Sequence, residues 1–222
     1  MEPAGHELFS YNELCKLSPD QMQTYKALLE TFKEVHRQGS SATTAEKGSA
    51  LEKLVTYLLR ISGGIFTVKQ NVKTGSSESD QVIKLNEKRA MLKAHGLIPS
   101  RLGYFLGECK NYNSKIGVTY IGKFYSLLQT TQINTGILFS YYGVTGKGWS
   151  DASGLIKKMY LQREHETNRV AIVSFNIDDF EAILSGDNFF RILEDKLDAL
   201  QLDTNVVRYI SHHSAESLII SL

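Results

Sequence analysis

Apolar residues recur at helical spacing in two segments near the start of the chain. The first segment follows the helix-start signal Ser18-Pro19-Asp20 and extends to about Gln38. The second runs from Thr44 to Ile61 and stops at Ser62-Gly63-Gly64. The small and polar residues 39–44 between them are typical of a linker. We therefore expect an N-terminal helical region over residues 1–43 and a main domain over residues 44–222.

Beyond these helices, strand-like and helix-like patterns alternate. Runs rich in β-branched and aromatic residues predict strands at 65–73, 80–85, 104–110, 136–142 and 169–175, with a further short strand at 206–210. Helical patterns lie at 116–131, 153–165 and 177–200, the last with a break at Ser185-Gly186. The turn 74–79 makes the first two strands antiparallel. This order predicts an α/β fold with a mixed central β-sheet flanked by helices, plus an N-terminal helical extension.

Composition adds limits on compartment and partner. The formal net charge is +1, so attraction to nucleic acid has to come from a local basic patch. The two cysteines form no CxxC pair, which favours a reduced intracellular protein. No apolar run approaches the roughly 18 residues of a membrane span. The first residues lack the basic-then-apolar order of a signal peptide. We therefore expect a cytoplasmic protein with no membrane contact.

The strongest chemical signal is the pair Glu108-x-Lys110 on a predicted strand. Residues two apart on a strand point to one face, so a carboxylate and an ammonium group project side by side. Hard divalent cations need several converging oxygen ligands, and phosphodiester hydrolysis also needs a positive group near the attacking water. Asp80, at the start of the preceding strand, can supply a second carboxylate, and Glu52, on the flank of the second helix, a third. Cys109 is expected to turn its side chain into the core while its carbonyl oxygen remains near enough to bind metal.

Each of these residues also has an ordinary interpretation. An isolated ExK pair on a strand is usually a solvated surface pair. An Asp at the junction of a turn and a strand usually serves the turn, and Glu52 alone would be a solvated helix flank. The combination, and the apolar run Tyr104-Phe105-Leu106 beside the pair, favour a site.

A helix Glu, a hairpin Asp, and a strand ExK followed by a helix form the layout of the PD-(D/E)xK restriction-endonuclease-like nucleases. The chain resembles most closely the Mrr-like restriction endonucleases, over roughly residues 49–184. The resemblance rests on the segments "GSALEKLVTYLLRISGG", "SSESDQVIKLN", "FLGECKNYNSKIGV" and "NTGILFSYYGVTGKGWSDASGLI". It implies that Asp80 and Glu108 bind Mg²⁺ (Mn²⁺ as a substitute), that Lys110 positions the water, and that Glu52 assists the metal.

The sequence departs from the family pattern at two places. Ser79 stands where the family name has proline. The segment 86–103 is longer than a simple strand connection, and Glu78 is the alternative ligand if the register of Asp80 shifts. This segment is basic, with Lys88, Arg89, Lys93 and Arg101. It either contacts a nucleic-acid backbone or is an ordinary solvated loop.

Two functions from different classes remain open. The first is a Mg²⁺-dependent endodeoxyribonuclease, a hydrolase of DNA phosphodiester bonds in restriction or anti-phage (antiviral) defence. Its N-terminal helices would then contact a regulatory protein partner or a second copy of the chain. The second is a catalytically silent nuclease-fold subunit that binds nucleic acid or protein. Metal dependence separates the two.

Overall fold

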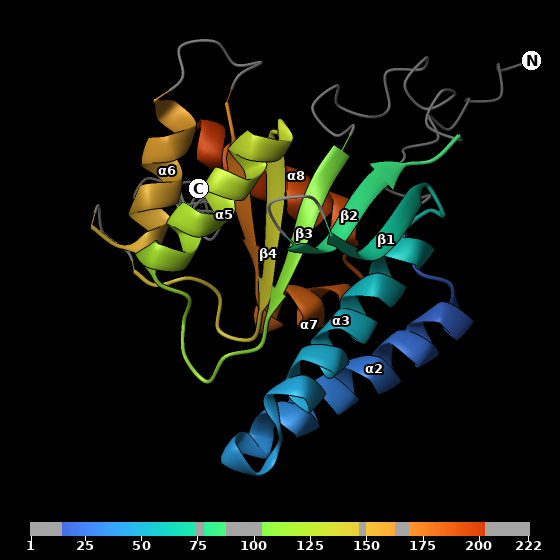
Figure 1. The fold of residues 1–222 in the computed structure, drawn as a ribbon. Helices are drawn as coiled ribbons and strands as arrows, with labels where there is room; N and C mark the ends of the chain where they lie inside the picture. The colour runs from blue at the N-terminus through green and yellow to red at the C-terminus, as the bar shows by residue number, and fades with distance from the viewer. Residues whose placement is uncertain (1–14, 74–77, 88–103, 147–149, 163–168, 203–222) are drawn as a thin grey trace, which may run out of the picture.

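The computed structural model describes residues 15–73, 78–87, 104–146, 150–162 and 169–202, and at 71–73 and 78–80 the backbone alone (Figure 1). Its strands form one five-stranded sheet in the order β1-β2-β3-β4-β5. The strands are β1 (Phe66–Lys73), β2 (Glu78–Leu85), β3 (Tyr104–Lys110), β4 (Thr135–Ser140) and β5 (Ala171–Phe175). The first three are antiparallel neighbours, whereas β3–β4 and β4–β5 are parallel. The predicted α/β class with a mixed central sheet is confirmed.

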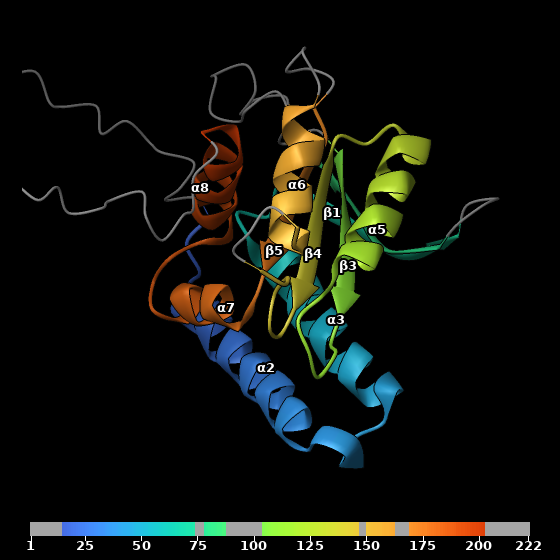
Figure 2. The same ribbon diagram turned by 90° about the vertical axis from the view of Figure 1, so that its left-hand side faces the viewer.

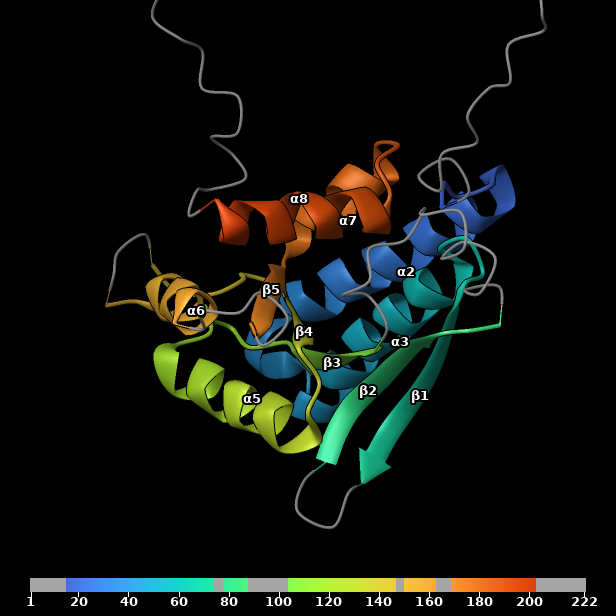
Figure 3. The ribbon, with the colours of Figure 1, turned by 90° about the horizontal axis from the view of Figure 1, so that it is seen from above.

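Helices cover both faces of the sheet. They are α2 (Pro19–Arg37), the 3-10 turn η1 (Gly39–Ser41), α3 (Thr44–Ile61), α5 (Val118–Thr131), α6 (Ala152–Leu161), α7 (Ile177–Leu184) and α8 (Phe189–Gln201). Helices α5 and α6 lie on one face, and α2, α3, α7 and α8 lie on the other (Figure 3). None of the helices in the described ranges is long and apolar enough to cross a membrane.

The starts of the two long N-terminal helices follow from their caps. The Ser18 hydroxyl accepts the N–H of Gln21, whose side chain accepts the N–H of Ser18 in return. Thr43 and Glu46 form the same reciprocal pair at the start of α3. Each pair satisfies N–H groups that a helix start leaves without an intrahelical partner. These caps lie where the sequence predicted each helix to begin.

Helix α2 packs into the same core as the sheet. Tyr25, Leu29 and Phe32 are fully buried. The Tyr25 hydroxyl donates to the carbonyl oxygen of Phe180 in α7 at 2.8 Å, and the ring of Phe32 meets that of Phe180 edge-on. Helix α2 thus lies beside both α3 and α7 (Figure 2). The division into two domains at residue 43 stays a prediction.

The two faces of β2 and β3 have different environments. On the α3 side, Gln81 is buried and its Nε2 donates to Thr56 of α3 at 3.0 Å. Gly107 faces the same way, since a Cβ there would lie 3.2 Å from the Gln81 side chain. Side chains alternate along a strand, so Glu108 and Lys110 face the α5 side. The structure thereby places the ExK pair on one face, as its spacing predicts.

Most predicted elements appear with small shifts at their ends. Strand β2 begins two residues before the predicted start at residue 80. The strand predicted over 136–142 ends at Ser140, whose hydroxyl accepts the N–H of Gly143 and starts a turn. The helix predicted over 153–165 ends at Leu161. The strand predicted at 206–210 lies outside the described residues.

Candidate functional site

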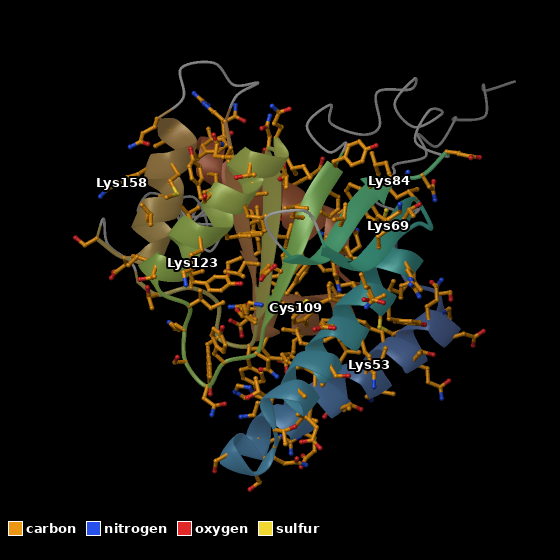
Figure 4. The ribbon with its side chains drawn as sticks, viewed as in Figure 1. Lys53, Lys69, Lys84, Cys109, Lys123 and Lys158 are labelled. Atoms are coloured by element: carbon orange, nitrogen blue, oxygen red, sulfur yellow. The ribbon has the colours of Figure 1, made fainter. Side chains whose placement is uncertain are left out.

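The site is built around the C-terminal end of β3, a central strand between β2 and β4. The Lys110 ammonium nitrogen lies 2.9 Å from Glu108 Oε1. The Glu108 side chain is 11% exposed and that of Lys110 22%, so the pair is not a solvated surface pair. Figure 4 labels Cys109, the residue between them in the sequence, near the end of β3.

A third residue, Tyr120 of α5, completes this cluster. Its hydroxyl donates to Glu108 Oε1 at 2.5 Å, and the Lys110 ammonium lies 5.7 Å from the centre of its ring. Sequence analysis did not identify Tyr120. The only signal was a tyrosine near the start of the helix that follows the ExK strand, which is too general to single it out.

The two carboxylate oxygens of Glu108 have different surroundings. Oε1 is close to both Tyr120 and Lys110, whereas the buried Oε2 has no hydrogen-bond partner among the described groups. A buried carboxylate oxygen without a partner is costly and rare in folded proteins. The Glu108 carboxylate therefore offers one oxygen for a ligand that the described residues do not supply.

A buried ion pair elsewhere in the chain shows the contrast. The Lys196 ammonium lies 2.9 Å from Asp179 Oδ1, and the N–H of Asn176 donates to Asp179 Oδ2 at 2.8 Å. Both oxygens of Asp179 are thus used, one by Lys196 of α8 and the other by the capping box at the start of α7. The Glu108–Lys110 pair does not follow this pattern.

Asp80 lies on the neighbouring strand at the matching level. Gln81 opposite Gly107 is the last pair in the antiparallel register of β2 and β3, and Asp80 and Glu108 are the next residue on each strand. Residues directly opposite each other in an antiparallel pair belong to the same face of the sheet. The side chain of Asp80 lies outside the described part of the structure, as does that of the alternative ligand Glu78. Their roles as metal ligands stay predictions.

Glu52 lies on α3, on the other side of the sheet from α5. Two contacts bracket its position along the helix. Five residues earlier, the carbonyl oxygen of Lys47 accepts from Asn111 Nδ2 at 3.1 Å, next to the end of β3. Four residues later, Thr56 accepts from Gln81, the neighbour of Asp80. Glu52 is half-buried between these levels. Its assistance to a metal stays a prediction.

The Cys109 side chain is 5% exposed and belongs to the hydrophobic core, which confirms the predicted orientation. Metal binding by its carbonyl oxygen stays a prediction. The basic residues Lys88, Arg89, Lys93 and Arg101 lie outside the described residues. Among the residues whose side chains are described, no three His, Cys, Asp or Glu residues form a group that could hold a metal, and Asp80 is not in that set.

A buried polar network holds the chain just beyond Lys110. His36 Nδ1 lies 2.9 Å from Asn111 Oδ1, and the His36 ring stacks on Tyr141 with centroids 3.5 Å apart. The Lys47 ammonium donates to Asn113 Oδ1 at 3.1 Å. Burial lowers the pKa of the His36 imidazole, which favours its neutral form. Helices α2 and α3 thus hold in place the residues that directly follow β3.

Comparisons with known proteins give little beyond this geometry. No protein-family model matches the chain, and no curated protein is similar to it in sequence. Among solved structures, the chain is similar to the DNA modification-dependent restriction endonuclease AspBHI, with 16% identity and a TM-score of 0.37. The match covers 92% of this chain and 45% of that protein's chain. The chain thus spans less than half of that protein, and a similarity this low does not establish its function.

Proposed function

We propose that this chain is a metal-dependent endonuclease that hydrolyses phosphodiester bonds in DNA, in restriction or anti-phage defence. The proposal rests on the surroundings of the Glu108 carboxylate. Its carboxylate is buried beside Lys110, one oxygen is held by Tyr120 and Lys110, and the other has no partner among the described groups. A cation at that second oxygen would remove the cost of leaving it unpaired.

The donors proposed for this site are all oxygen atoms, which suits a hard cation such as Mg²⁺, with Mn²⁺ as its substitute. Glu108 and Asp80 would hold it, with the carbonyl oxygen of Cys109 as a further oxygen donor, and Glu52 would assist only by reaching it from the other side of the sheet. A bound divalent cation would supply Lewis-acid stabilisation of the phosphate and a more acidic water. Lys110 would orient that water and offset the negative charge that develops on the phosphate.

The face of the sheet beside this cluster suits a phosphate backbone. Lys69 on β1, Lys84 on β2 and Tyr104 on β3 occupy the same face as Glu108, as the strand register shows. Tyr104 is 51% exposed, and Lys69 is exposed as well. Lys123 lies on α5, across β3 from them (Figure 4). Lysines on both sides of the cluster provide the attraction that the chain's net charge of +1 does not.

The decisive experiment is cleavage of supercoiled plasmid DNA by the purified protein with Mg²⁺, with Mn²⁺ and with EDTA. We expect nicking or linearisation only with metal. Glu108→Gln and Lys110→Met should each lower the cleavage rate about 100-fold or more, in line with loss of one preorganised electrostatic contact. Glu181→Gln is the matched control, because Glu181 forms an exposed ion pair with Lys33 at 3.0 Å, on α7 and away from β3.

Circular dichroism and melting temperature should show that all variants remain folded. Metal-independent cleavage, or full activity in both folded site variants, would refute the proposal. An inert wild-type protein that still binds DNA would instead support the silent nuclease-fold subunit.

DNA contact by the lysine face has its own test. Lys69→Gln and Lys84→Gln together should reduce the slope of log K against log salt by about 2, since each phosphate contact contributes about 0.9. Lys26→Gln on the exposed side of α2 is the control and should leave the slope unchanged. A double variant with the wild-type slope would show that DNA does not use this face.

A further inference from the structure

Tyr120 contacts both charged groups of the proposed site. Its hydroxyl donates to Glu108 Oε1, and its ring lies 5.7 Å from the Lys110 ammonium nitrogen. The ring also meets the edge of Tyr112, with centroids 6.5 Å apart.

These contacts determine which carboxylate oxygen is used. With Tyr120 and Lys110 both at Oε1, rotating the carboxyl group would break a hydrogen bond inside a buried site. Oε2 is thereby left as the buried oxygen that has no hydrogen-bond partner among the described groups, which a cation could bind. A carboxylate held in this way needs no reorientation when the cation arrives. It therefore binds the cation more tightly than a freely rotating carboxylate would.

Tyr120 is a more rigid anchor than Lys110. A tyrosine hydroxyl is placed by two side-chain torsions, whereas the lysine ammonium sits at the end of a flexible four-carbon stem. The position of Tyr120 is further fixed because α5 packs on the sheet through the buried residues Ile121, Phe124 and Leu128. The helix therefore supplies the fixed hydrogen bond and the strand supplies the mobile charge.

We propose that Tyr120 is a positioning residue, which orients the Glu108 carboxylate toward a divalent cation and limits the motion of Lys110. This inference rests on the proposed function. It assigns α5 a role in the site beyond covering the sheet. Tyr120 does not itself bind the cation or the scissile phosphate.

The test measures metal binding without DNA. Mn²⁺ is titrated into the full-length protein by isothermal calorimetry, for wild type, Tyr120→Phe and Tyr125→Phe. Tyr120→Phe keeps the ring and removes only the hydroxyl, and it should weaken Mn²⁺ binding about 10- to 100-fold, the usual effect of losing a group that holds a ligand in place. Tyr125→Phe, on the same helix and equally half-buried, should match wild type.

Plasmid cleavage is then measured against Mn²⁺ concentration. The Tyr120→Phe variant should need more Mn²⁺ for half-maximal rate and recover part of its rate at high Mn²⁺. A general loss of packing would not give that recovery. Wild-type protein that binds no Mn²⁺ and cleaves nothing would overturn the proposed function itself. Wild-type protein that binds and cleaves, beside a Tyr120→Phe variant of equal Mn²⁺ affinity, would overturn the role of Tyr120 alone.

Discussion

Helix α5 packs closely against the sheet at Gly136, and Gly136→Ala tests that approach. A Cβ at this position would lie 2.7 Å from both Leu128 Cδ1 and Phe124 Cε1. Carbon atoms in ordinary contact are about 3.5–4.0 Å apart, so both side chains would have to withdraw by roughly 0.8 Å or more. Leu128 is fully buried and Phe124 is only 3% exposed. The added Cβ would therefore push α5 itself outward.

Overpacking of this kind costs about 1–3 kcal/mol in the free energy of unfolding. For a chain of this size that corresponds to a fall in melting temperature of roughly 3–10 °C. Gly122→Ala is the matched control, because Gly122 lies within α5 and a Cβ there meets nothing within 4 Å. It should raise the free energy of unfolding by about 0.5–1 kcal/mol, the usual gain of alanine over glycine in a helix.

Scanning calorimetry and urea unfolding measure both variants. The two substitutions are chemically identical and should change stability in opposite directions. If Gly136→Ala melts at or above the wild-type temperature, α5 does not lie this close to β4. The outward shift should also separate Tyr120, one turn before Phe124, from Glu108. Mn²⁺ affinity should then fall in Gly136→Ala and stay unchanged in Gly122→Ala, at a temperature where both are folded.

Three further predictions concern stability. Burial raises the pKa of Glu194 to about 7, so its charged form opposes folding above that pH. After allowing for its partial exposure, Glu194→Gln should raise the free energy of unfolding by about 1 kcal/mol at pH 8 and have little effect at pH 4, as measured by urea unfolding. His36 has a lowered pKa, chiefly through burial and to a lesser extent the charge of Lys47, so the unfolded chain binds its proton more tightly. Stability should therefore fall as pH drops below 6.5, and His36→Gln should flatten that dependence of melting temperature on pH. Tyr25→Phe removes the hydrogen bond to the Phe180 carbonyl and should cost about 1 kcal/mol in urea unfolding, whereas an unchanged midpoint would show that the bond adds nothing.

The elements that could be predicted from the sequence are those with local causes. Helix α3 has the predicted bounds because the Thr43–Glu46 capping box and the Gly63-Gly64 pair are readable signals at its two ends. Strand β3 also has the predicted bounds, and the shared face of Glu108 and Lys110 follows directly from strand alternation. The low exposure of Glu108 and Lys110 agrees with the apolar run Tyr104-Phe105-Leu106 that precedes them on the strand.

The parts that could not be predicted depend on how distant elements dock. Tyr120 meets Glu108 only because α5 packs at a particular level of the sheet, and that level depends on the absence of a side chain at Gly136. The network of His36 and Asn111 joins residues 75 positions apart with no sequence signature. The element order implied by the PD-(D/E)xK resemblance is present in the structure. The convergence of Asp80 and Glu52 on Glu108 was inferred from that resemblance and remains a prediction.

The contact between α2 and α7 has a consequence for the order in which the molecule is assembled. Tyr25 and its acceptor in Phe180 are 155 residues apart, so α2 is completed by a helix that is made much later. The apolar side of α2 has no partner in α7 until residues 177–184 have left the ribosome. Contacts between such distant residues slow folding and leave apolar surface open to aggregation in the meantime. A nascent chain ending after β4 would already contain Glu108, Lys110 and Tyr120 but would lack β5 and α7. The proposed catalytic residues would then reach their final arrangement only after α7 has been made.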